Sequence, residues 1–282
     1  MRLATRFLLL LNRLFPLPDH PFNRALQGRG TYADWQLEQA PRTLQVFRFY
    51  TDPQTMVAGR RVLDLGCGAG GKAVYCATLG AAHVVGVDIV PHYREEGEAL
   101  ARRLGVADRV RFLTADARSL PLPDGSVDTV LMSDVVEHLA DPEAVFREVY
   151  RVLAPGGRVY ISFPPYYHPY GAHLSDAIGI PWVHRFFPEP VLGEAYQALV
   201  AHLPDGDRRL SLRFGNPRDG EWRLTYINRM TIRRFRELLN RLPLRVAYYY
   251  QSPLRPYLRP LAWLAPEYFT RLVICVLEKD RT

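Results

Sequence analysis

The chain has 282 residues, 48% of them hydrophobic and 23% charged, which is typical of an ordinary soluble globular protein of one large domain, or of one domain with a sizeable insertion. Its three cysteines lie far from any C-x-x-C spacing, so neither a disulfide framework nor a structural zinc site is indicated, and a reducing cytoplasm is expected. The net charge of +7 arises from two basic flanks around an acidic middle, and because the arginines form no compact run with interleaved aromatics, no nucleic-acid partner is expected.

The N-terminal segment begins with "MRLATRFLLLLNRLF", a basic end followed by an apolar run from Phe7 to Leu11. This run is too short to span a bilayer, and no small-x-small cleavage site follows it, so secretion is not expected. We expect residues 1–59 to form a helical segment ahead of the main domain.

Alternating strands and helices are predicted from residue 61 onward. Short apolar runs bounded by Gly, Asp or Pro indicate buried parallel strands at 61–66, 83–88, 109–116, 127–133 and 158–163. Helical spacing of apolar residues occupies 70–81, 91–106 and 141–157, the last beginning at the cap Asp141 and ending at Gly156 and Gly157. This βαβ series predicts an α/β fold with a doubly wound sheet, whose ligands lie at the carboxyl ends of the strands.

The first predicted strand ends in a loop with almost no side chains. The sequence "VLDLGCGAGG" (62–71) contains Gly66, Gly68, Gly70 and Gly71, which allow backbone N–H groups to approach a ligand closely. The spacing satisfies both G-x-G-x-x-G and G-x-G-x-G. The glycines alone therefore leave a dinucleotide and a nucleoside cofactor open.

Three acidic residues near strand ends help to decide between a dinucleotide and a nucleoside cofactor. Asp88 ends the second strand, where its carboxylate can accept hydrogen bonds from both ribose hydroxyls. Asp64 precedes the first glycine by two residues, so it would repel a pyrophosphate but suits an ammonium or sulfonium group, or a loop that needs bracing. Asp116 follows the third strand and offers a carboxylate to an adenine amino group. Three acids and no arginine in the loop favour a cationic nucleoside.

Residues 60–163 resemble the class I S-adenosylmethionine-dependent methyltransferases, in particular the small-molecule group similar to the ubiquinone and menaquinone methyltransferases. The glycine loop, the later acids, "VVEHL" (135–139) and "LAPGG" (153–157) occur in the family's order, with a weaker continuation over 229–250. The resemblance implies a Rossmann-like sheet of seven strands with the last strand antiparallel, an inserted cap, and S-adenosyl-L-methionine as the cofactor.

The resemblance also implies the roles of individual residues. The expected cofactor contacts are Asp64, Gly66, Cys67, Gly68, Gly70, Asp88, Ile89, Asp116, Ala117 and Ser133. His138 and His168 are the candidate bases, although a base is optional because the sulfonium is already activated. The candidate substrate contacts are Tyr166, Tyr167, His173 and Trp182. No metal site is expected, because no carboxylate–histidine metal spacing accompanies these residues.

Two segments lie outside the common core. Residues 164–228 form a long insertion that should carry its own helices, including 191–203, and act as a cap. Residues 252–269 separate two strands that the family joins by a short hairpin, within a C-terminal part of the core that spans 229–282. We expect the insertions to form a largely apolar acceptor chamber from Trp182, Phe186, Phe187, Tyr257, Trp263 and Tyr268.

The sequence therefore predicts a methyltransferase that acts on a small hydrophobic molecule, with O-methylation favoured. A nicotinamide-dependent oxidoreductase and a nucleotide-binding module without turnover remain as alternatives. The N-terminal and 252–269 segments are apolar and rich in arginine. They could contact an anionic membrane at its surface, but the favoured interpretation is that they form a wall over a hydrophobic pocket. The identity of the acceptor and the oligomeric state do not follow from the sequence.

Overall fold

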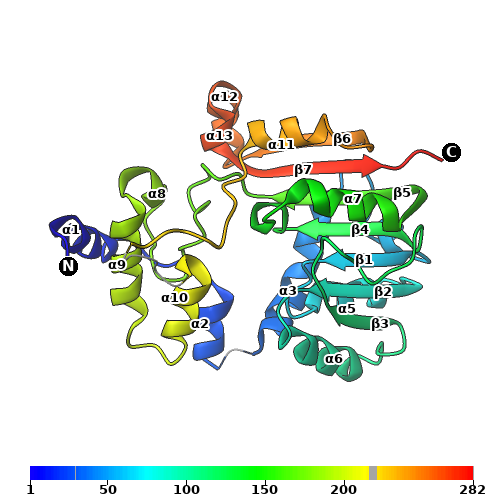
Figure 1. Ribbon diagram of the computed structural model, residues 1–282, viewed down its shortest axis with the longest axis horizontal. Coiled ribbons are helices and arrows are strands. Elements are labelled where there is room, and N and C mark those ends of the chain that lie inside the picture. The colour runs from blue at the N-terminus through cyan, green and yellow to red at the C-terminus, as the bar shows by residue number, and fades with distance from the viewer. Residues whose placement is uncertain (29, 216–220, 282) are drawn as a thin grey trace.

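The computed structural model describes residues 1–28, 30–215 and 221–281, which are organised around a mixed sheet of seven strands (Figure 1). The strand order is β3-β2-β1-β4-β5-β7-β6, with neighbouring pairs parallel from β3 to β5 and β7 antiparallel to both β5 and β6. The predicted doubly wound α/β sheet with an antiparallel last strand is confirmed. The strands are β1 (Arg61–Leu65), β2 (His83–Asp88), β3 (Val110–Thr114), β4 (Val127–Ser133), β5 (Leu153–Phe163), β6 (Arg245–Pro253) and β7 (Thr270–Glu278).

Helices cover both faces of the sheet because alternate strand residues point to opposite sides. In β1, Leu63 and Leu65 pack in the core beneath α7 (Pro142–Val152) and α11 (Ile232–Leu239), whereas Val62 packs on the opposite face. That opposite face is covered by α3 (Tyr32–Gln45), α5 (Gly71–Thr78) and α6 (Tyr93–Arg103), and the short α4 (Pro53–Val57) precedes β1. The sheet is therefore buried on both sides, as its apolar strands require.

Helix α7 begins where the sequence predicts and ends earlier. The carboxylate of Asp141 accepts a hydrogen bond from Ala144 N at 3.0 Å, which caps the helix start. The helix ends at Val152 instead of continuing to Gly157, because Leu153 pairs with Val127 and begins β5. Pairing with the neighbouring strand thus replaces the last predicted helical turn.

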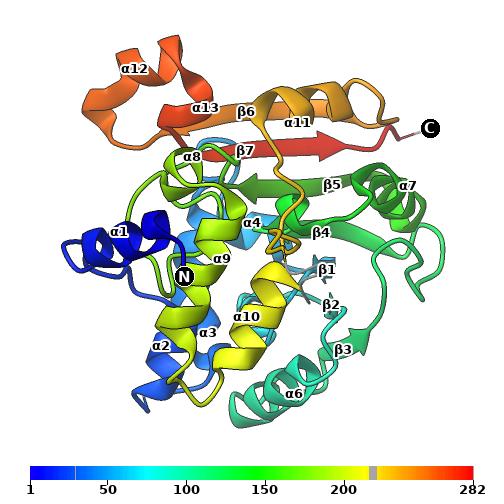
Figure 2. The same cartoon turned by 60° about the vertical axis from the view of Figure 1, so that its left-hand side comes forward.

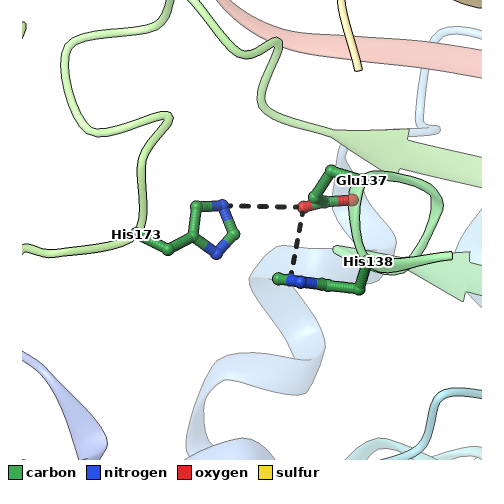
Figure 3. Close-up of side chains that lie close together, drawn as sticks. All are labelled: Glu137, His138 and His173. Carbon is green, nitrogen blue, oxygen red and sulfur yellow. Dashed lines mark ion pairs between the residues drawn. The ribbon is translucent and has the colours of Figure 1, made fainter. Parts of the chain in front are cut away.

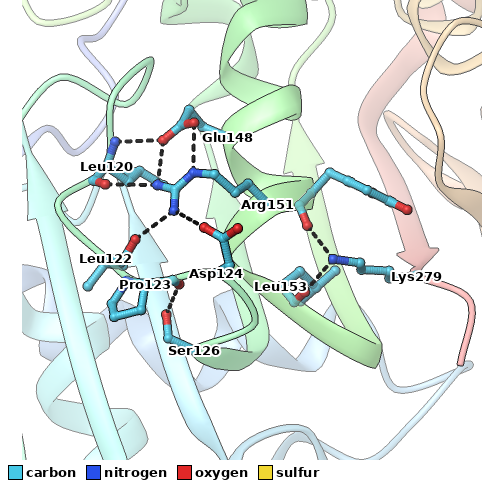
Figure 4. Close-up of polar contacts among 10 residues, drawn as sticks. Leu120, Leu122, Pro123, Asp124, Ser126, Glu148, Arg151, Leu153 and Lys279 are labelled. Carbon is cyan, nitrogen blue, oxygen red and sulfur yellow. Dashed lines mark hydrogen bonds and ion pairs between the residues drawn. The ribbon is translucent and has the colours of Figure 1, made fainter. Parts of the chain in front are cut away.

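The connection between β3 and β4 is held against α7 by Arg151 (Figure 4). The guanidinium donates to the carbonyl oxygens of Leu120 at 3.0 Å and Leu122 at 2.8 Å, and to the Asp124 carboxylate at 2.7 Å. The carboxylate of Glu148 accepts from Leu120 N at 2.9 Å. These bonds fix the connection that begins at the carboxyl end of β3, where ligands of such sheets bind.

The 164–228 insertion has its own helices and its own hydrophobic core. It contains α8 (Val183–Phe186), α9 (Glu189–Val200) and α10 (Gly206–Phe214), and Tyr196 and Phe214 are fully buried in its core together with Leu8 of α1 (Leu3–Asn12). Figures 1 and 2 show α1, α2 (Pro21–Leu26), α9 and α10 grouped beyond the ends toward which the parallel strands point. The N-terminal segment is thus divided, since α1 packs in the cap and α3 packs on the core.

The 252–269 segment joins β6 to β7 through the 3₁₀ turn η2 (Pro256–Leu258), α12 (Arg259–Leu264) and α13 (Pro266–Phe269). The carboxylate of Glu267 in α13 accepts from the first backbone N–H groups of α11, at 2.9 Å from Ile232 and 2.9 Å from Arg233. A negative charge at a helix N-terminus is favourable, so this insertion also stabilises α11. The segment thus separates two antiparallel strands, and the sequence analysis did not predict the helices within it.

Candidate active site

The glycine loop after β1 turns through left-handed backbone conformations. Gly66, Gly68 and Gly70 have φ values of 66°, 55° and 84°, which side chains with a Cβ adopt only at a cost. The N–H groups of Gly66 and Cys67 both donate to the carbonyl oxygen of Val87, at 2.8 and 3.0 Å. These two hydrogen bonds hold the loop at the carboxyl end of β2, where its backbone can contact a ligand.

Three of the small loop residues support packing. A Cβ on Gly70 would lie 2.4 Å from Cε1 of Phe112, and one on Gly71 would lie 2.4 Å from the carbonyl oxygen of Ala33 in α3. Cys67 is 3% exposed and belongs to the hydrophobic core. The predicted cofactor contacts Cys67 and Gly70 thus shape the loop from behind, and Gly71 allows α3 to lie against α5.

A cavity of about 330 Å³, here called the loop cavity, opens at the carboxyl ends of β1 to β4. Its volume lies in the range of small-molecule sites. Six of the predicted cofactor contacts line it together, namely Gly66, Gly68, Asp88, Ile89, Asp116 and Ala117.

Asp88 both braces the loop and faces the loop cavity. One carboxylate oxygen accepts from Gly68 N at 2.8 Å and the other from Val90 N at 2.9 Å. Because each carboxylate oxygen has two lone pairs, both can accept a further hydrogen bond. Asp88 is therefore suited to the two hydroxyls of a ribose while it holds the loop in shape.

Asp116 is balanced by an arginine that the sequence analysis did not consider. Its carboxylate accepts from the backbone N of Arg118 at 2.8 Å and from the guanidinium of Arg118 at 2.6 Å. These hydrogen bonds hold the pKa of Asp116 below its usual range. Both residues line the loop cavity, so the Asp116 carboxylate, which was expected to contact the adenine, is already paired with a cation.

Asp64 does not reach the loop cavity. Its side chain is fully buried, and Nζ of Lys72 lies 2.8 Å from Oδ1. A buried carboxylate needs such a partner, since an unpaired charge is costly in the protein interior. The predicted contact between Asp64 and a cationic ligand is therefore replaced by an internal ion pair beneath the loop.

A second cavity of about 380 Å³ adjoins the first and is here called the histidine cavity. Its wall mixes aromatic side chains with polar ones, among them His20, Lys72, Ser133, His168, Tyr170, His173 and Arg213. The residues that line both cavities form their junction, namely Tyr32, Gly66, Tyr93, Asp134, His138 and Tyr226. A ligand in one cavity therefore meets a ligand in the other at this junction.

The two candidate bases differ in the nitrogen that they offer. Nδ1 of His138 lies 2.9 Å from the carbonyl oxygen of Tyr226, so it carries the proton and leaves the lone pair on Nε2. Nδ1 of His168 instead accepts from Tyr170 N at 3.1 Å, which puts the proton of the neutral ring on Nε2. Burial lowers the pKa of each imidazole to about 4. Both rings are neutral at pH 7, but only His138 has a free acceptor nitrogen.

Of the four predicted substrate contacts, only His173 lines the histidine cavity. Tyr166 packs against Tyr167, which stacks on Tyr268 of the 252–269 segment with ring centroids 5.2 Å apart. The indole N–H of Trp182 donates to the carbonyl oxygen of Tyr167 at 3.0 Å. These aromatic side chains therefore join the cap to the 252–269 segment, away from the cavity wall.

The expected apolar acceptor chamber is not what lies beside the glycine loop. Trp182, Phe186 and Phe187 line a separate apolar groove of about 450 Å³ together with Phe7 and other residues of the N-terminal segment. Trp263 is 83% exposed. The prediction was wrong because these side chains follow α8 and α12 to the surface, whereas the polar residues of the 168–175 segment face the sheet.

Several lining residues were missed by the sequence analysis, among them His20, Lys72, Asp134, Arg213 and Tyr226. Asp134 follows β4 directly, so the rule that favours acids at strand ends could have found it. Arg213 belongs to α10 of the cap and gave no local signal.

The residues present fit S-adenosyl-L-methionine. The loop cavity offers Asp88 to a ribose and bare backbone at Gly66 and Gly68, and the carboxylate of Asp134 lies at the junction, where a sulfonium charge would be stabilised. The hydroxyl oxygen of Ser133, which lines the histidine cavity, is buried and has no hydrogen-bond partner among the described residues. An unused polar group of this kind is typical of a ligand site.

Comparisons with known proteins agree with this geometry. A family model described as a methyltransferase domain matches residues 63–161. The demethylmenaquinone methyltransferase of Thermus thermophilus is 39% identical over 230 residues, which cover 73% of this chain and 91% of that protein. That alignment extends well beyond the matched domain.

Other similarities are partial or structural. The probable chloroplastic tocopherol O-methyltransferase of Oryza sativa subsp. japonica is 39% identical over 102 residues, and the matched region covers 36% of this chain but only 28% of that protein's length. A crystal structure of a putative sarcosine dimethylglycine methyltransferase from Galdieria sulphuraria superimposes with a TM-score of 0.55 at 17% identity, covering 92% of this chain and 97% of that one. At this identity the superposition supports the fold alone.

Proposed function

This chain belongs to the class I S-adenosylmethionine-dependent methyltransferases of the ubiquinone and menaquinone type, and from that premise we propose that it methylates a small molecule bound in the histidine cavity. The observation that carries the proposal is the junction of the two cavities. Because the same six residues line both, a cofactor bound at Asp88 and an acceptor beside the histidines would meet there. Family membership also decides the cofactor that the glycines left open.

The main task of the chain would be alignment. Bound S-adenosyl-L-methionine supplies a methyl group that its sulfonium has already activated. The aromatic side chains of Tyr32, Tyr93 and Tyr226 wall the junction and would exclude water from it, and Asp134 would hold the positive charge in place. Holding two reactants in line in this way accounts for a large part of the rate of such reactions.

We favour O-methylation, and the support is the state of His138. Its Nε2 lone pair is free at neutral pH, and the Tyr226 carbonyl orients the ring. Such an imidazole can accept the proton of a hydroxyl at the junction. His168, with its proton on Nε2, would donate a hydrogen bond to the acceptor and orient it.

A hydrophobic acceptor is supported by the relatives and by the apolar groove. Two of the relatives are named after demethylmenaquinone and tocopherol. Within the groove, Trp182 donates its backbone N–H to the carbonyl oxygen of Pro169, between His168 and Tyr170 of the histidine cavity. Among the described residues the groove shares no lining residue with the histidine cavity, and we propose that the tail of an acceptor whose polar head lies in the cavity is directed toward it.

The choice of cofactor can be tested without an acceptor. Titration of the protein with S-adenosylhomocysteine is expected to give saturable binding at one site per chain, whereas NADH is expected to give none, because the family to which the chain belongs uses S-adenosyl-L-methionine. Isothermal calorimetry measures both. Binding of NADH in place of S-adenosylhomocysteine would overturn the proposed function.

We further propose a cytoplasmic protein that contacts a membrane surface. Leu3, Leu10 and Leu14 are exposed on or just after α1, which carries Arg6 and is flanked by Arg2 and Arg13. Apolar and cationic side chains along one short helix are typical of peripheral contact with anionic lipid. No helix among the described residues has the length and apolarity needed to cross a membrane.

Membrane contact predicts salt-sensitive binding to anionic vesicles. Flotation with anionic liposomes should recover the wild-type protein, with each arginine near the surface contributing about 1 kcal/mol at low salt. Leu10→Glu should abolish the recovery, and Leu104→Glu, a matched change at an exposed position in α6's C-terminal turn, should not. If the wild type floats with neither anionic nor neutral liposomes, the acceptor reaches the enzyme from solution.

A further inference from the structure

Three potential metal ligands converge at the edge of the histidine cavity (Figure 3). Glu137 and His138 belong to the 3₁₀ turn η1 (Val136–His138) after β4, and His173 comes from the cap. Oε1 of Glu137 lies 4.0 Å from Nε2 of His138 and 3.9 Å from Nε2 of His173. One ligand atom from each of the three residues lies within 4.8 Å of the others.

Glu137 is a buried carboxylate in need of a partner. It is 3% exposed, and both of its side-chain oxygens lack a hydrogen-bond partner among the described residues. Burial and the nearby Asp134 raise the pKa of Glu137 well above its usual range. A cation between Glu137 and the two imidazoles would relieve this unfavourable burial.

The orientation of His138 is the one that metal-binding histidines adopt. Its Nδ1–H donates to the Tyr226 carbonyl oxygen at 2.9 Å, so its Nε2 lone pair faces Glu137. A hydrogen bond from the second ring nitrogen to a backbone carbonyl is the usual support of such a ligand. His173 is held with φ at 55°, a left-handed conformation that is unusual for a residue with a side chain.

We propose that Glu137, His138 and His173 bind one divalent transition-metal ion of the Zn²⁺ class. Two imidazole nitrogens and one carboxylate suit first-row transition metals, whereas Mg²⁺ and Ca²⁺ prefer oxygen ligands. With bonds of about 2.0–2.2 Å, ligand atoms on one ion are about 3–4 Å apart. The three side chains need only a small closure to reach that geometry. This proposal departs from the sequence-based expectation of no metal site.

The position of the site indicates how the metal would act. His138 and His173 both line the histidine cavity, so a coordination position remains open toward that space. An acceptor hydroxyl bound there would lose its proton more readily, because a Lewis-acidic ion lowers the pKa of a bound oxygen. This role rests on the proposed function. While the ion is bound, His138 is one of its ligands, and the proton of the acceptor hydroxyl would pass to solvent water in the histidine cavity. The binding of the ion itself does not depend on methyl transfer.

Zinc binding can be measured directly on the full chain without a tag. After removal of metals, titration with Zn²⁺ against a chromophoric chelator is expected to give one site per chain. Glu137→Gln and His173→Gln should each weaken Zn²⁺ binding by more than the roughly 10–100-fold that loss of a supporting hydrogen bond costs at metal sites. His184→Gln, which removes a half-buried histidine of α8, should leave it unchanged.

S-adenosylhomocysteine binding provides the control for folding and separates the two proposals. Both cluster variants should bind S-adenosylhomocysteine as the wild type does, since Glu137 and His173 do not line the loop cavity among its described residues. Substoichiometric Zn²⁺ binding by the wild type, or equal affinity in all variants, would overturn the metal site. Loss of S-adenosylhomocysteine binding in the wild type would instead overturn the proposed function.

Discussion

Replacing Asp88 by alanine is expected to weaken binding of S-adenosylhomocysteine by about 2–4 kcal/mol, or roughly 30- to 900-fold in affinity. The carboxylate would lose two charge-assisted hydrogen bonds to the ribose. It would also lose its two bonds to the loop, from Gly68 N and Val90 N. Calorimetric titration of the purified variant measures the change.

The control for this experiment is Asp108→Ala, which removes an exposed aspartate from the turn before β3. It should bind S-adenosylhomocysteine with unchanged affinity, because the residue lies away from both cavities. Thermal unfolding of the ligand-free Asp88 variant checks that the fold survives. An Asp88→Ala protein that is folded and retains wild-type affinity would contradict the assignment.

Replacing His138 by glutamine is expected to lower turnover on the order of 10²–10⁴-fold while cofactor affinity stays near that of the wild type. Glutamine cannot accept a proton as imidazole does, and it would also remove a ligand of the proposed metal. The measurement is the rate of S-adenosylhomocysteine formation with an acceptor on which the wild type turns over. A loss of turnover is therefore expected whether His138 accepts the proton itself or holds the proposed ion.

His168→Gln provides the comparison for the His138 variant. We propose that the ring of His168, with its proton on Nε2, orients the acceptor, and the glutamine amide can still donate a hydrogen bond in its place. A smaller loss of turnover is expected, and it should be seen mainly in the Michaelis constant. Undiminished activity in both variants would mean that alignment alone suffices and that neither histidine is needed.

The cofactor half of the site could be predicted because its residues are local to strand ends. Asp88, Asp116 and the glycine loop each follow a recognisable buried strand. Parallel strands bring their carboxyl ends to one edge of the sheet, so residues far apart in the sequence meet without any further information. The same reasoning applies to Asp134, although the sequence analysis did not use it.

The acceptor half could not be predicted in the same way. The aromatic residues of the two insertions were expected to form a chamber, but several of them face the surface or a separate groove, and none of the six lines the histidine cavity. In an insertion without regular periodicity, nothing local indicates which side chains face the sheet. The packing of α1 against α9 and α10 decides it.

By itself the sequence determined the α/β order of the chain, the glycine loop, the position of Asp88 at a strand end and the family, since hydrophobic periodicity and short motifs are local properties. Only the tertiary structure decided that Asp64 pairs with Lys72, that His138 offers Nε2, and that Glu137 meets His173 across the gap between core and cap. These three pairings depend on which side chains and backbone groups the packing of the chain buries next to one another. Glu137 and His173, which are 36 residues apart along the chain, come together because the cap folds back over the carboxyl ends of the strands, and no local pattern encodes that approach.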